Sequence, residues 1–361
     1  MGNKSSLAEF HKGNGAAFAE FDGWSLPKNF GDVEAEYHAV RTAVGLLDFS
    51  NRGLLQLTGP DRITFLQGLV SNDVAALRPS QGTYAAVLNQ QGKVLGDVQV
   101  LCSENSLYLD LWEPLKDKIL EHLNRYLVAD EVEIADRTSE YGTLSLQGPR
   151  SGELAQRLFE ADPLPSHPLG HVIVKLENTF VCLVRSNRTR ETGFDLIAPG
   201  TVLAKLAEIL TEVGKNLSVK WIGSDALNTV LVEDGIPRYG IDFTEDNLLL
   251  EVGLNNAVSF TKGCYLGQEI IERVRSRGHV NKKLCGLVLD GEFPAHHGAP
   301  IQVNEKPVGT VTSSVCSPKL GHAVALGYIH RDHWQPGTSV TVISDTGSLT
   351  ATVTELPFAK A

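Results

Sequence analysis

The stretch VGTVTSSVCSPKLGHAVALGYI, residues 308–329, decides the architecture of the last part of the chain. Its short apolar runs are separated by turns that contain glycine, and it has almost no helical periodicity. The same pattern begins at about Leu284 and continues to the C-terminus. It predicts a small β-barrel or β-sandwich over residues 284–361, with a domain boundary at residue 284.

The preceding residues, 1–283, mix strand and helix patterns without the regular alternation of a Rossmann sheet, which predicts an α+β region. Three strands joined by turns are expected within TYAAVLNQQGKVLGDVQVLCSENSLYLDLW, residues 83–112. Upstream, a turn is expected near residues 23–32. Over residues 33–48 the apolar residues recur at helical spacing, which predicts one helix there.

The 361-residue chain carries a net charge of −11, which argues against nucleic-acid binding because duplex binders need a broad basic surface. Its five cysteines are odd in number and form no C-x-x-C pair, so neither a disulfide framework nor a metal site is predicted. This cysteine usage suits a reducing, cytoplasmic location. No apolar run reaches the ~18 residues of a membrane-spanning helix, so no membrane association is expected.

A cysteine stands between two glycines in FTKGCYLGQEIIERVRSRGHVNKKL, residues 260–284. Cys264 precedes an amphipathic run that predicts a helix, whose unpaired N–H groups would favour the thiolate, with help from Lys262 and Arg273. The alternative is that Cys264 is a small buried hydrophobe. The flanking Gly263 and Gly267 suggest a close approach of the backbone to another group.

A basic run follows this cysteine in an otherwise acidic chain. Its members are Arg273, Arg275, Arg277, His279, Lys282 and Lys283. Such a run is either a solvated face or a docking site for an anionic tail or partner, and the sequence leaves both open.

Two carboxylates have settings that suit ligand binding. Asp97 lies in an imperfectly alternating strand, so its facing is ambiguous, and in a pocket it would hydrogen-bond or receive a proton. Glu191 lies in a turn beside Arg188 and Arg190, where it could accept two parallel hydrogen bonds from an amidine-like heterocycle. The alternative for both is an ordinary solvated carboxylate.

The segment KGCYLGQE, residues 262–269, resembles the signature of the YgfZ-type tetrahydrofolate-binding proteins, whose mitochondrial relatives assist iron–sulfur cluster assembly. Nearly the whole chain is similar to the wider superfamily of the glycine-cleavage T-protein, an aminomethyltransferase. Examples are LTGPDRITFLQGLVSNDV at residues 57–74 and LVEDGIPRYGID at residues 231–242. The resemblance implies a three-lobed ring with a central folate pocket, followed by a C-terminal β-barrel.

The resemblance also implies roles for single residues. Asp97 falls where the T-protein has its catalytic aspartate, which contacts the folate nitrogen that carries the one-carbon unit. Glu191 matches the glutamate that binds the pteridine edge. Cys264 would be the chemical handle of the YgfZ type. The other residues expected to line the tetrahydrofolate pocket are Tyr108, Trp112, Lys262, Gly263, Gly267 and Gln268.

Some positions depart from the T-protein pattern. Trp112 replaces a pocket asparagine, and Leu227 and Leu231 replace arginines. In the signature, Gln268 replaces an arginine and Cys264 an aspartate. Losing arginine forks changes how a site recognises anionic groups, so these departures bear on aminomethyl transfer more than on folate binding.

Three functions therefore remain open. The first is a tetrahydrofolate-binding protein that acts in iron–sulfur cluster maintenance or one-carbon handling, with iron–sulfur assembly proteins as partners. The second is a tetrahydrofolate-dependent aminomethyltransferase that uses Asp97 and a lipoyl-carrying protein as donor. The third is an interaction module that binds no folate. Whether the protein is an enzyme depends on this choice.

Overall fold

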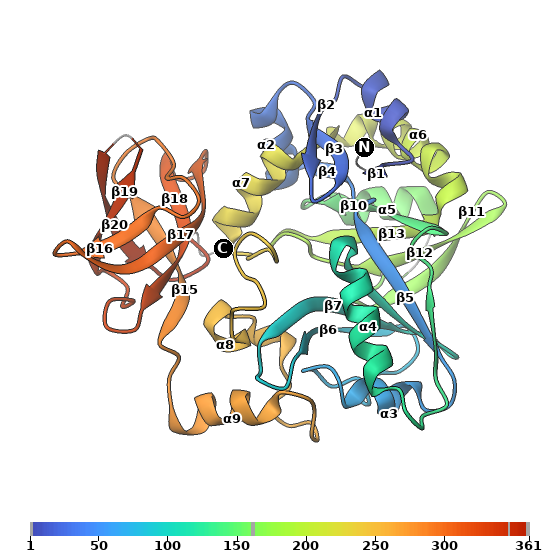
Figure 1. The fold of residues 1–361 in the computed structure, drawn as a ribbon. Coiled ribbons are helices and arrows are strands. Elements are labelled where there is room, and N and C mark those ends of the chain that lie inside the picture. Colours follow the sequence, from blue (N-terminus) through green and yellow to red (C-terminus); the bar gives the residue numbers. More distant parts are fainter. Residues whose placement is uncertain (1–2, 160–162, 346, 359–361) are drawn as a thin grey trace. The chain divides into compact units, whose positions relative to one another are not determined.

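A computed structural model describes residues 3–159, 163–345 and 347–358, and the chain forms two compact units (Figure 1). The first comprises Met1–Val87, Gly96–Leu227 and Asn256–Tyr265. The second comprises Leu88–Leu95, Asn228–Asn255 and Leu266–Ala361. Among the described residues, no helix has the length and apolar character needed to cross a membrane.

Three sheets characterise the first unit. The largest has six strands in the order β11-β12-β13-β10-β4-β14, with bounds His171–Leu176, Thr179–Arg185, Gly193–Pro199, Tyr141–Gln147, Val44–Asp48 and Val219–Trp221. The second has five strands in the order β6-β7-β8-β5-β9, with bounds Gln81–Leu88, Val94–Cys102, Leu107–Trp112, Arg52–Thr58 and Glu133–Asp136. A small sheet has the order β1-β3-β2, with bounds Asn3–Lys4, Trp24–Asn29 and Ala17–Phe21.

Short helices connect these strands. They are α1 (Ala8–Gly13), α2 (Val33–Thr42), α3 (Arg62–Gln67), η1 (Glu113–Leu115), α4 (Lys116–Tyr126), α5 (Ser151–Phe159), η2 (Gly200–Val202), α6 (Leu203–Gly214) and η3 (Lys215–Leu217). Helix α7 (Ser224–Asp234) leads from the first unit into the second.

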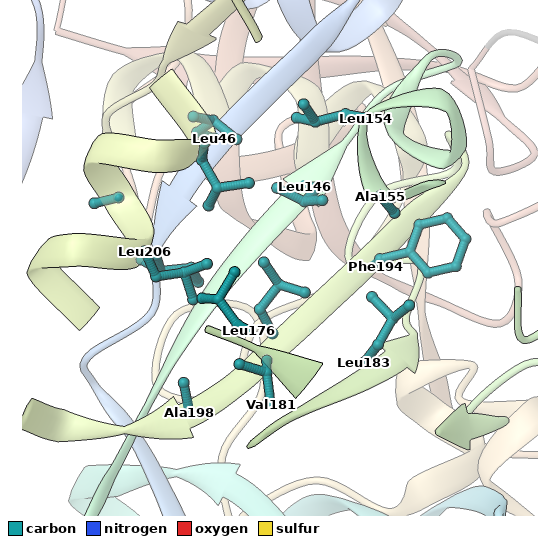
Figure 2. Close-up of a cluster of buried hydrophobic side chains, with 14 of the residues drawn as sticks. Leu46, Leu146, Leu154, Ala155, Leu176, Val181, Leu183, Phe194, Ala198 and Leu206 are labelled. Carbon is teal, nitrogen blue, oxygen red and sulfur yellow. The ribbon is translucent and has the colours of Figure 1, made fainter. Parts of the chain in front are cut away.

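The main core lies between one face of the six-stranded sheet and helices α5 and α6 (Figure 2). Phe194, Leu196 and Ala198 of β13 point into it, whereas the alternate residues Asp195 and Ile197 belong to the opposite face of the strand. That opposite face packs on the five-stranded sheet through a cluster that includes Leu54 and Leu101. The six-stranded sheet is therefore apolar toward its helices and partly polar toward the second sheet.

Two sequence predictions fail near the N-terminus. The helix predicted over residues 33–48 ends at Thr42, and Val44–Asp48 forms β4, which is buried between β10 and β14. A short apolar run of this kind has no periodicity that separates a buried strand from a helix. The turn expected near residues 23–32 contains β3, which pairs with β2 in a hairpin. By contrast, the three strands expected over residues 83–112 are confirmed as β6, β7 and β8.

The second unit contains a closed barrel in the strand order β15-β18-β17-β16-β19-β20. Their bounds are Lys282–Leu289, His322–His330, Lys306–Ser317, Pro300–Val303, Ser339–Ser344 and Gly347–Thr354. Before the barrel lie α8 (Leu249–Val252), η4 (Asn255–Ala257) and α9 (Gln268–Arg277). The predicted α+β class and the C-terminal β-barrel are confirmed, and the alternative of a sandwich is excluded.

The compact units do not follow the predicted boundary at residue 284. Strand β15 begins at Lys282, close to that position, but residues 88–95, 228–255 and 266–281 also cluster with the barrel. The second unit is thus assembled from three separate pieces of chain. Sequence patterns could place the start of the barrel but not these non-local additions.

Candidate functional site

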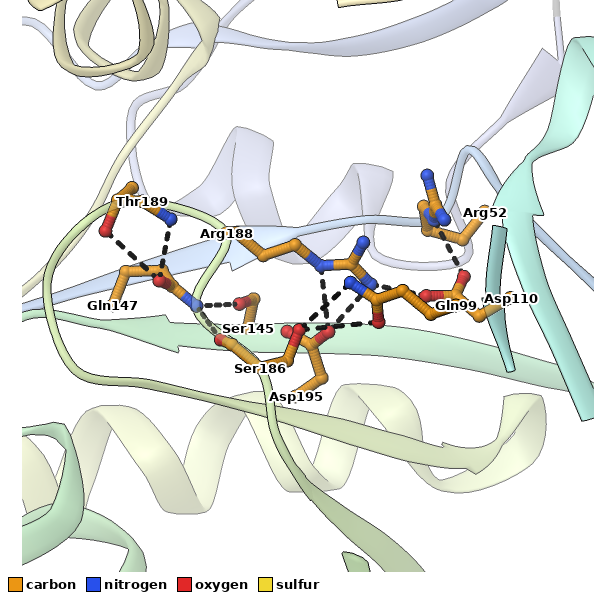
Figure 3. Close-up of polar contacts among 9 residues, drawn as sticks. All are labelled: Arg52, Gln99, Asp110, Ser145, Gln147, Ser186, Arg188, Thr189 and Asp195. Atoms are coloured by element: carbon orange, nitrogen blue, oxygen red, sulfur yellow. Dashed lines mark hydrogen bonds and ion pairs between the residues drawn. The ribbon is translucent and has the colours of Figure 1, made fainter. Parts of the chain in front are cut away.

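A layer of paired charges lies between the two larger sheets of the first unit (Figure 3). Arg52 of β5 donates from Nε to Asp110 of β8 at 2.7 Å. Arg188, in the β12–β13 loop, donates from Nη2 to the same carboxylate at 2.5 Å and from Nε to Asp195 of β13 at 2.8 Å. Arg188 therefore joins the two sheets and fixes the start of the loop that carries Glu191.

Burial and pairing act against each other on these charges. Burial raises the pKa of Asp110, but Arg52 and Arg188 outweigh it and hold that pKa below its usual value. Burial alone would lower the pKa of Arg188, whereas Asp195 and Asp110 raise it above the ordinary arginine value. The residues Asp110 and Asp195 are only 3% and 1% exposed, so this layer holds the fold rather than offering groups to a ligand.

The β12–β13 loop is also held at its centre by a buried amide. Gln147 of β10 donates from Nε2 to the Ser186 carbonyl at 2.9 Å and accepts at Oε1 from the backbone N–H of Thr189 at 3.2 Å (Figure 3). Gly193 closes the loop against the same amide, and a Cβ there would overlap the Gln147 side chain. The loop therefore has a defined conformation before any ligand binds.

Asp97 and Glu191 each stand close in sequence to a member of the charged layer, Asp97 two residues before Gln99 and Glu191 three residues after Arg188. Asp97 shares a face of β7 with Gln99, whose backbone lies opposite Asp110 in the ladder with β8. The facing of Asp97, ambiguous in sequence, is thus toward the space between the two sheets. Glu191 is half-buried, and its Oε1 lies 3.3 Å from Nη1 of Arg41 on α2. The sequence-predicted acids come from different elements that the Arg188 layer ties together.

A residue that the sequence analysis missed contacts Asp97. Tyr84 of β6 donates its hydroxyl to Asp97 Oδ2 at 2.9 Å. Burial, with the nearby Asp97 charge, raises the pKa of Tyr84, so the phenol stays protonated and remains a donor. The sequence predicted the two strands but not their register, so it could not pair Tyr84 with Asp97.

Trp112 and Tyr108 are separated along β8. Trp112, partly exposed, lies opposite Arg52 at the end of the strand nearer Asp97. Tyr108 lies opposite Leu101, four residues from Asp97, or about 13 Å along an extended strand. It accepts a hydrogen bond from Gln56 at 3.0 Å and lines a different cavity of about 450 Å³. Asp97 is not among the residues that line that cavity, and a role of Tyr108 in folate binding stays a prediction.

The Lys262 side chain is held by hydrogen bonds within the protein. Its ammonium donates to the carbonyls of Gln67, Val70 and Asn72 at 2.7, 2.7 and 2.8 Å, at the last residue of α3 and just beyond it. An ammonium has three donors, so all of them are used within the protein. Burial lowers the pKa of Lys262 to about 8. The expected contact of Lys262 with a ligand is therefore corrected to the bracing of α3.

The rest of the signature divides between exposed and constrained positions. Cys264 is exposed, which excludes the alternative of a buried hydrophobe. The predicted helix is confirmed as α9, with Gln268 as its first residue, half-buried. Gly267 precedes it with φ +82°, and a Cβ there would lie 2.7 Å from the Asn89 carbonyl. At Gly263 a Cβ would meet no heavy atom within 4 Å, so the close approach expected there is not seen among the described residues.

The basic run does not form one face. Arg275 pairs with Glu272 on α9 at 3.4 Å, while Lys282 and Lys283 stack over the rings of Tyr328 and Trp334 in the barrel. The side chain of Arg277 lies outside the described residues. Over the part of the chain that the structure describes, no three His, Cys, Asp or Glu side chains gather into a metal-binding cluster.

This fold and site define a class of proteins: an α+β region with half-buried acids close in sequence to an arginine-bridged layer, followed by a closed six-stranded barrel. Residues 7–262 match the family model of the GCVT N-terminal domain, and residues 282–360 match the glycine cleavage T-protein C-terminal barrel domain. The chain therefore belongs to the glycine-cleavage T-protein family.

Similar proteins extend over the full length. The aminomethyltransferase of Halothermothrix orenii is 30% identical over 355 residues, covering 98% of this chain and 99% of that protein. That of Rubrobacter xylanophilus is 32% identical over 327 residues, or 90% and 87% of the two chains. The crystal structure of glycine cleavage system aminomethyltransferase T from Bartonella henselae has a TM-score of 0.89 at 25% identity, covering 99% and 98%.

These relatives distinguish between the two family interpretations of the sequence. Each of them is named aminomethyltransferase, and none of these names refers to iron–sulfur clusters. They favour the aminomethyltransferase interpretation over the YgfZ-type one suggested by KGCYLGQE.

Proposed function

We propose that this protein is a tetrahydrofolate-dependent aminomethyltransferase. The observation that carries the proposal is the half-buried carboxylate of Asp97, held by the Tyr84 hydroxyl at 2.9 Å, at the position where the family resemblance expects the catalytic aspartate. Its donor would be an aminomethyl group on a lipoyl-carrying protein. The fit rests on the available acceptors: a reduced pterin presents N–H groups, and Asp97 and Glu191 are half-buried carboxylates that can accept from them.

Each residue has a distinct task in this proposal. Asp97 holds or receives a proton at Oδ next to the reacting nitrogen, and Tyr84 stabilises its anionic form by donating to it. Glu191 accepts hydrogen bonds from the pterin edge, while Arg41, 3.3 Å away, orients the glutamate. Trp112 packs against the ligand. Bound tetrahydrofolate supplies the nucleophilic nitrogen that accepts the one-carbon unit.

Calorimetric titration with tetrahydrofolate tests the binding half of the proposal. Wild-type protein is expected to bind, and Glu191→Ala to bind roughly 10- to 100-fold more weakly, as expected for the loss of charged hydrogen bonds. Glu208→Ala is the matched control, because Glu208 is an exposed carboxylate on α6. Failure of the wild type to bind would contradict the proposal and favour a folate-free interaction module.

A turnover assay tests the catalytic half. With an aminomethyl-loaded lipoyl carrier, wild-type protein is expected to form methylene-tetrahydrofolate, and Asp97→Asn to lower kcat by about 10²- to 10⁴-fold. The folate affinity of this variant should change little, because asparagine keeps the shape of the side chain. Binding of tetrahydrofolate without any turnover would reject the enzyme and leave a folate-binding protein.

A second candidate function is iron–sulfur cluster maintenance by a YgfZ-type folate-binding protein. The exposure of Cys264 in KGCYLGQE supports it, because an accessible thiol can be oxidised or bind a metal. The substitutions at Trp112, Leu227, Leu231 and Gln268 point the same way. Under this candidate, Cys264→Ser would abolish cellular rescue of cluster-dependent enzymes at unchanged folate affinity; full rescue would reject it. The expected cytoplasmic location stays a prediction under both candidates.

A further inference from the structure

The barrel of the second unit carries a cavity of about 760 Å³ on its outer surface. Its lining includes Lys282 of β15, Lys306 and Thr310 of β17, Tyr328 and His330 of β18, and His333 just beyond β18. None of these residues was assigned a task in the proposed transfer reaction. The cavity belongs wholly to the barrel and so does not depend on the first unit.

The strand register explains why these side chains meet. Lys282 lies directly opposite His330, and Thr310 lies directly opposite Tyr328. Ile329, between the two β18 residues, is fully buried in the barrel core, so its neighbours face outward. Lys306 starts β17 after a two-residue turn in which Asn304 and Glu305 both have positive φ, 50° and 63°. This turn type keeps a hairpin tight and holds Lys306 at the edge of the cavity.

The charge of the cavity is opposite to that of the protein. Within the described part of the chain, the lining contains two lysines and two histidines and no carboxylate, although the net charge is −11. The neighbouring Asp332 is not part of the lining. It lies 3.3 Å from His330 and 3.7 Å from Arg331, so an adjacent cation offsets it. A local positive potential in an acidic protein attracts anions to this position.

Tyr328 forms the boundary between this cavity and an apolar cluster that includes Val324 and Leu326. The Lys282 ammonium lies 4.9 Å from the centre of its ring, which holds that charge in place. Burial raises the pKa of Tyr328, with Glu251 and Asp242 adding to the effect, so the hydroxyl stays protonated. That hydroxyl is buried and has no hydrogen-bond partner among the described residues. The Tyr328 ring therefore contributes a fixed aromatic wall to the cavity and holds the Lys282 charge beside it.

We propose that this cavity binds a small ligand with several carboxylates along one chain. Lysine is a compact point charge without the planar fork that suits a single phosphate or carboxylate. Lys282 and Lys306 belong to β15 and β17, which lie on either side of β18, so their backbones are separated by two strand spacings, about 10 Å. The two lysines therefore match anionic groups that are spaced apart. The volume is within the range of small-molecule sites.

Calorimetric titration of the full-length protein with triglutamate tests this inference. Lys282→Gln and Lys306→Gln are each expected to weaken binding by about three- to fivefold, the effect of one partly exposed ion pair, and the double variant by about tenfold. Lys319→Gln is the matched control, because Lys319 is an exposed lysine of the β17–β18 turn outside the cavity. It should bind like the wild type.

Two further ligands separate the anion classes. Free glutamate and inorganic phosphate are each expected to bind at least about tenfold more weakly than triglutamate, because each can satisfy fewer of the spaced charges. Phosphate binding as tight as that of triglutamate would overturn the ligand class. No triglutamate binding, or an equal loss in Lys319→Gln and Lys306→Gln, would overturn the site itself.

Discussion

The buried acids that Arg188 pairs and the half-buried acids of the proposed site differ in what their charges do. Asp110 and Asp195 are buried and bound by Arg188. Asp97 and Glu191 are half-buried: Asp97 accepts a hydrogen bond from the Tyr84 hydroxyl, and Glu191 lies 3.3 Å from Arg41. The comparison teaches that the buried pairs of the charged layer hold the fold, whereas the acids proposed to face the ligand are found from their position and partial exposure.

The largest effect is expected from breaking the charged layer itself. Arg188→Met keeps much of the side-chain volume but leaves the buried Asp110 and Asp195 carboxylates without their shared cation. The free energy of unfolding in urea should fall by about 3–5 kcal/mol. Arg125→Met is the control, because Arg125 forms an exposed pair with Glu121 on α4 and should cost less than about 1 kcal/mol. Equal losses in the two variants would contradict the structural role of the layer.

The pH dependence of stability sharpens the same point. The pKa of Asp110 is lowered in the folded protein, so its contribution is fully present above the unfolded value of about 3.9 and is lost as pH falls through the folded pKa. The free energy of unfolding of the wild type, measured in urea, should therefore decrease as the pH is lowered below about 4. In Arg188→Met, protonation relieves the cost of a buried carboxylate that has lost this cation. The difference in free energy of unfolding between the variant and the wild type should therefore narrow as the pH falls. A gap that is constant from pH 7 to pH 3 would reject this account.

A smaller effect is expected at Lys262, where a charge predicted to face the ligand braces α3 instead. Lys262→Met removes the donors of three carbonyls and should lower the free energy of unfolding by about 2–4 kcal/mol. The tetrahydrofolate affinity of this variant, measured under conditions in which it is fully folded, should stay within about twofold of that of the wild type. Lys205→Met, an exposed change on α6, is the control. Unchanged stability with greatly weakened folate binding would return Lys262 to the ligand.

The smallest effect on stability is expected at Tyr84. Tyr84→Phe removes the donor to Asp97 and should change the free energy of unfolding by only about 1 kcal/mol. Without this donor the Asp97 carboxylate is less firmly held, so kcat should fall about tenfold while KM changes little. A change in KM alone would show that Tyr84 only shapes the pocket.

The sequence predicted local structure well where periodicity was clear. The strands β6, β7 and β8, helix α9 and the barrel all follow from local patterns. It failed at Val44–Asp48, whose burial on both sides comes from strands far away in the chain. Local patterns could not show that Lys262 reaches the end of α3, because that contact joins residues about 190 positions apart. The acids were identified by resemblance, while Arg188 was seen only as a neighbour of Glu191.

The two glycines of KGCYLGQE, Gly263 and Gly267, differ in whether the fold leaves room for a side chain. At position 267 any side chain would be strained by a φ of +82° and would collide with the Asn89 carbonyl, whereas at position 263 the space is open. Randomising both codons and selecting for folded protein should thus recover glycine at 267 and a broad mixture at 263. If selection for activity then restores glycine at 263 as well, the restriction must come from a molecule that approaches the backbone beside Cys264.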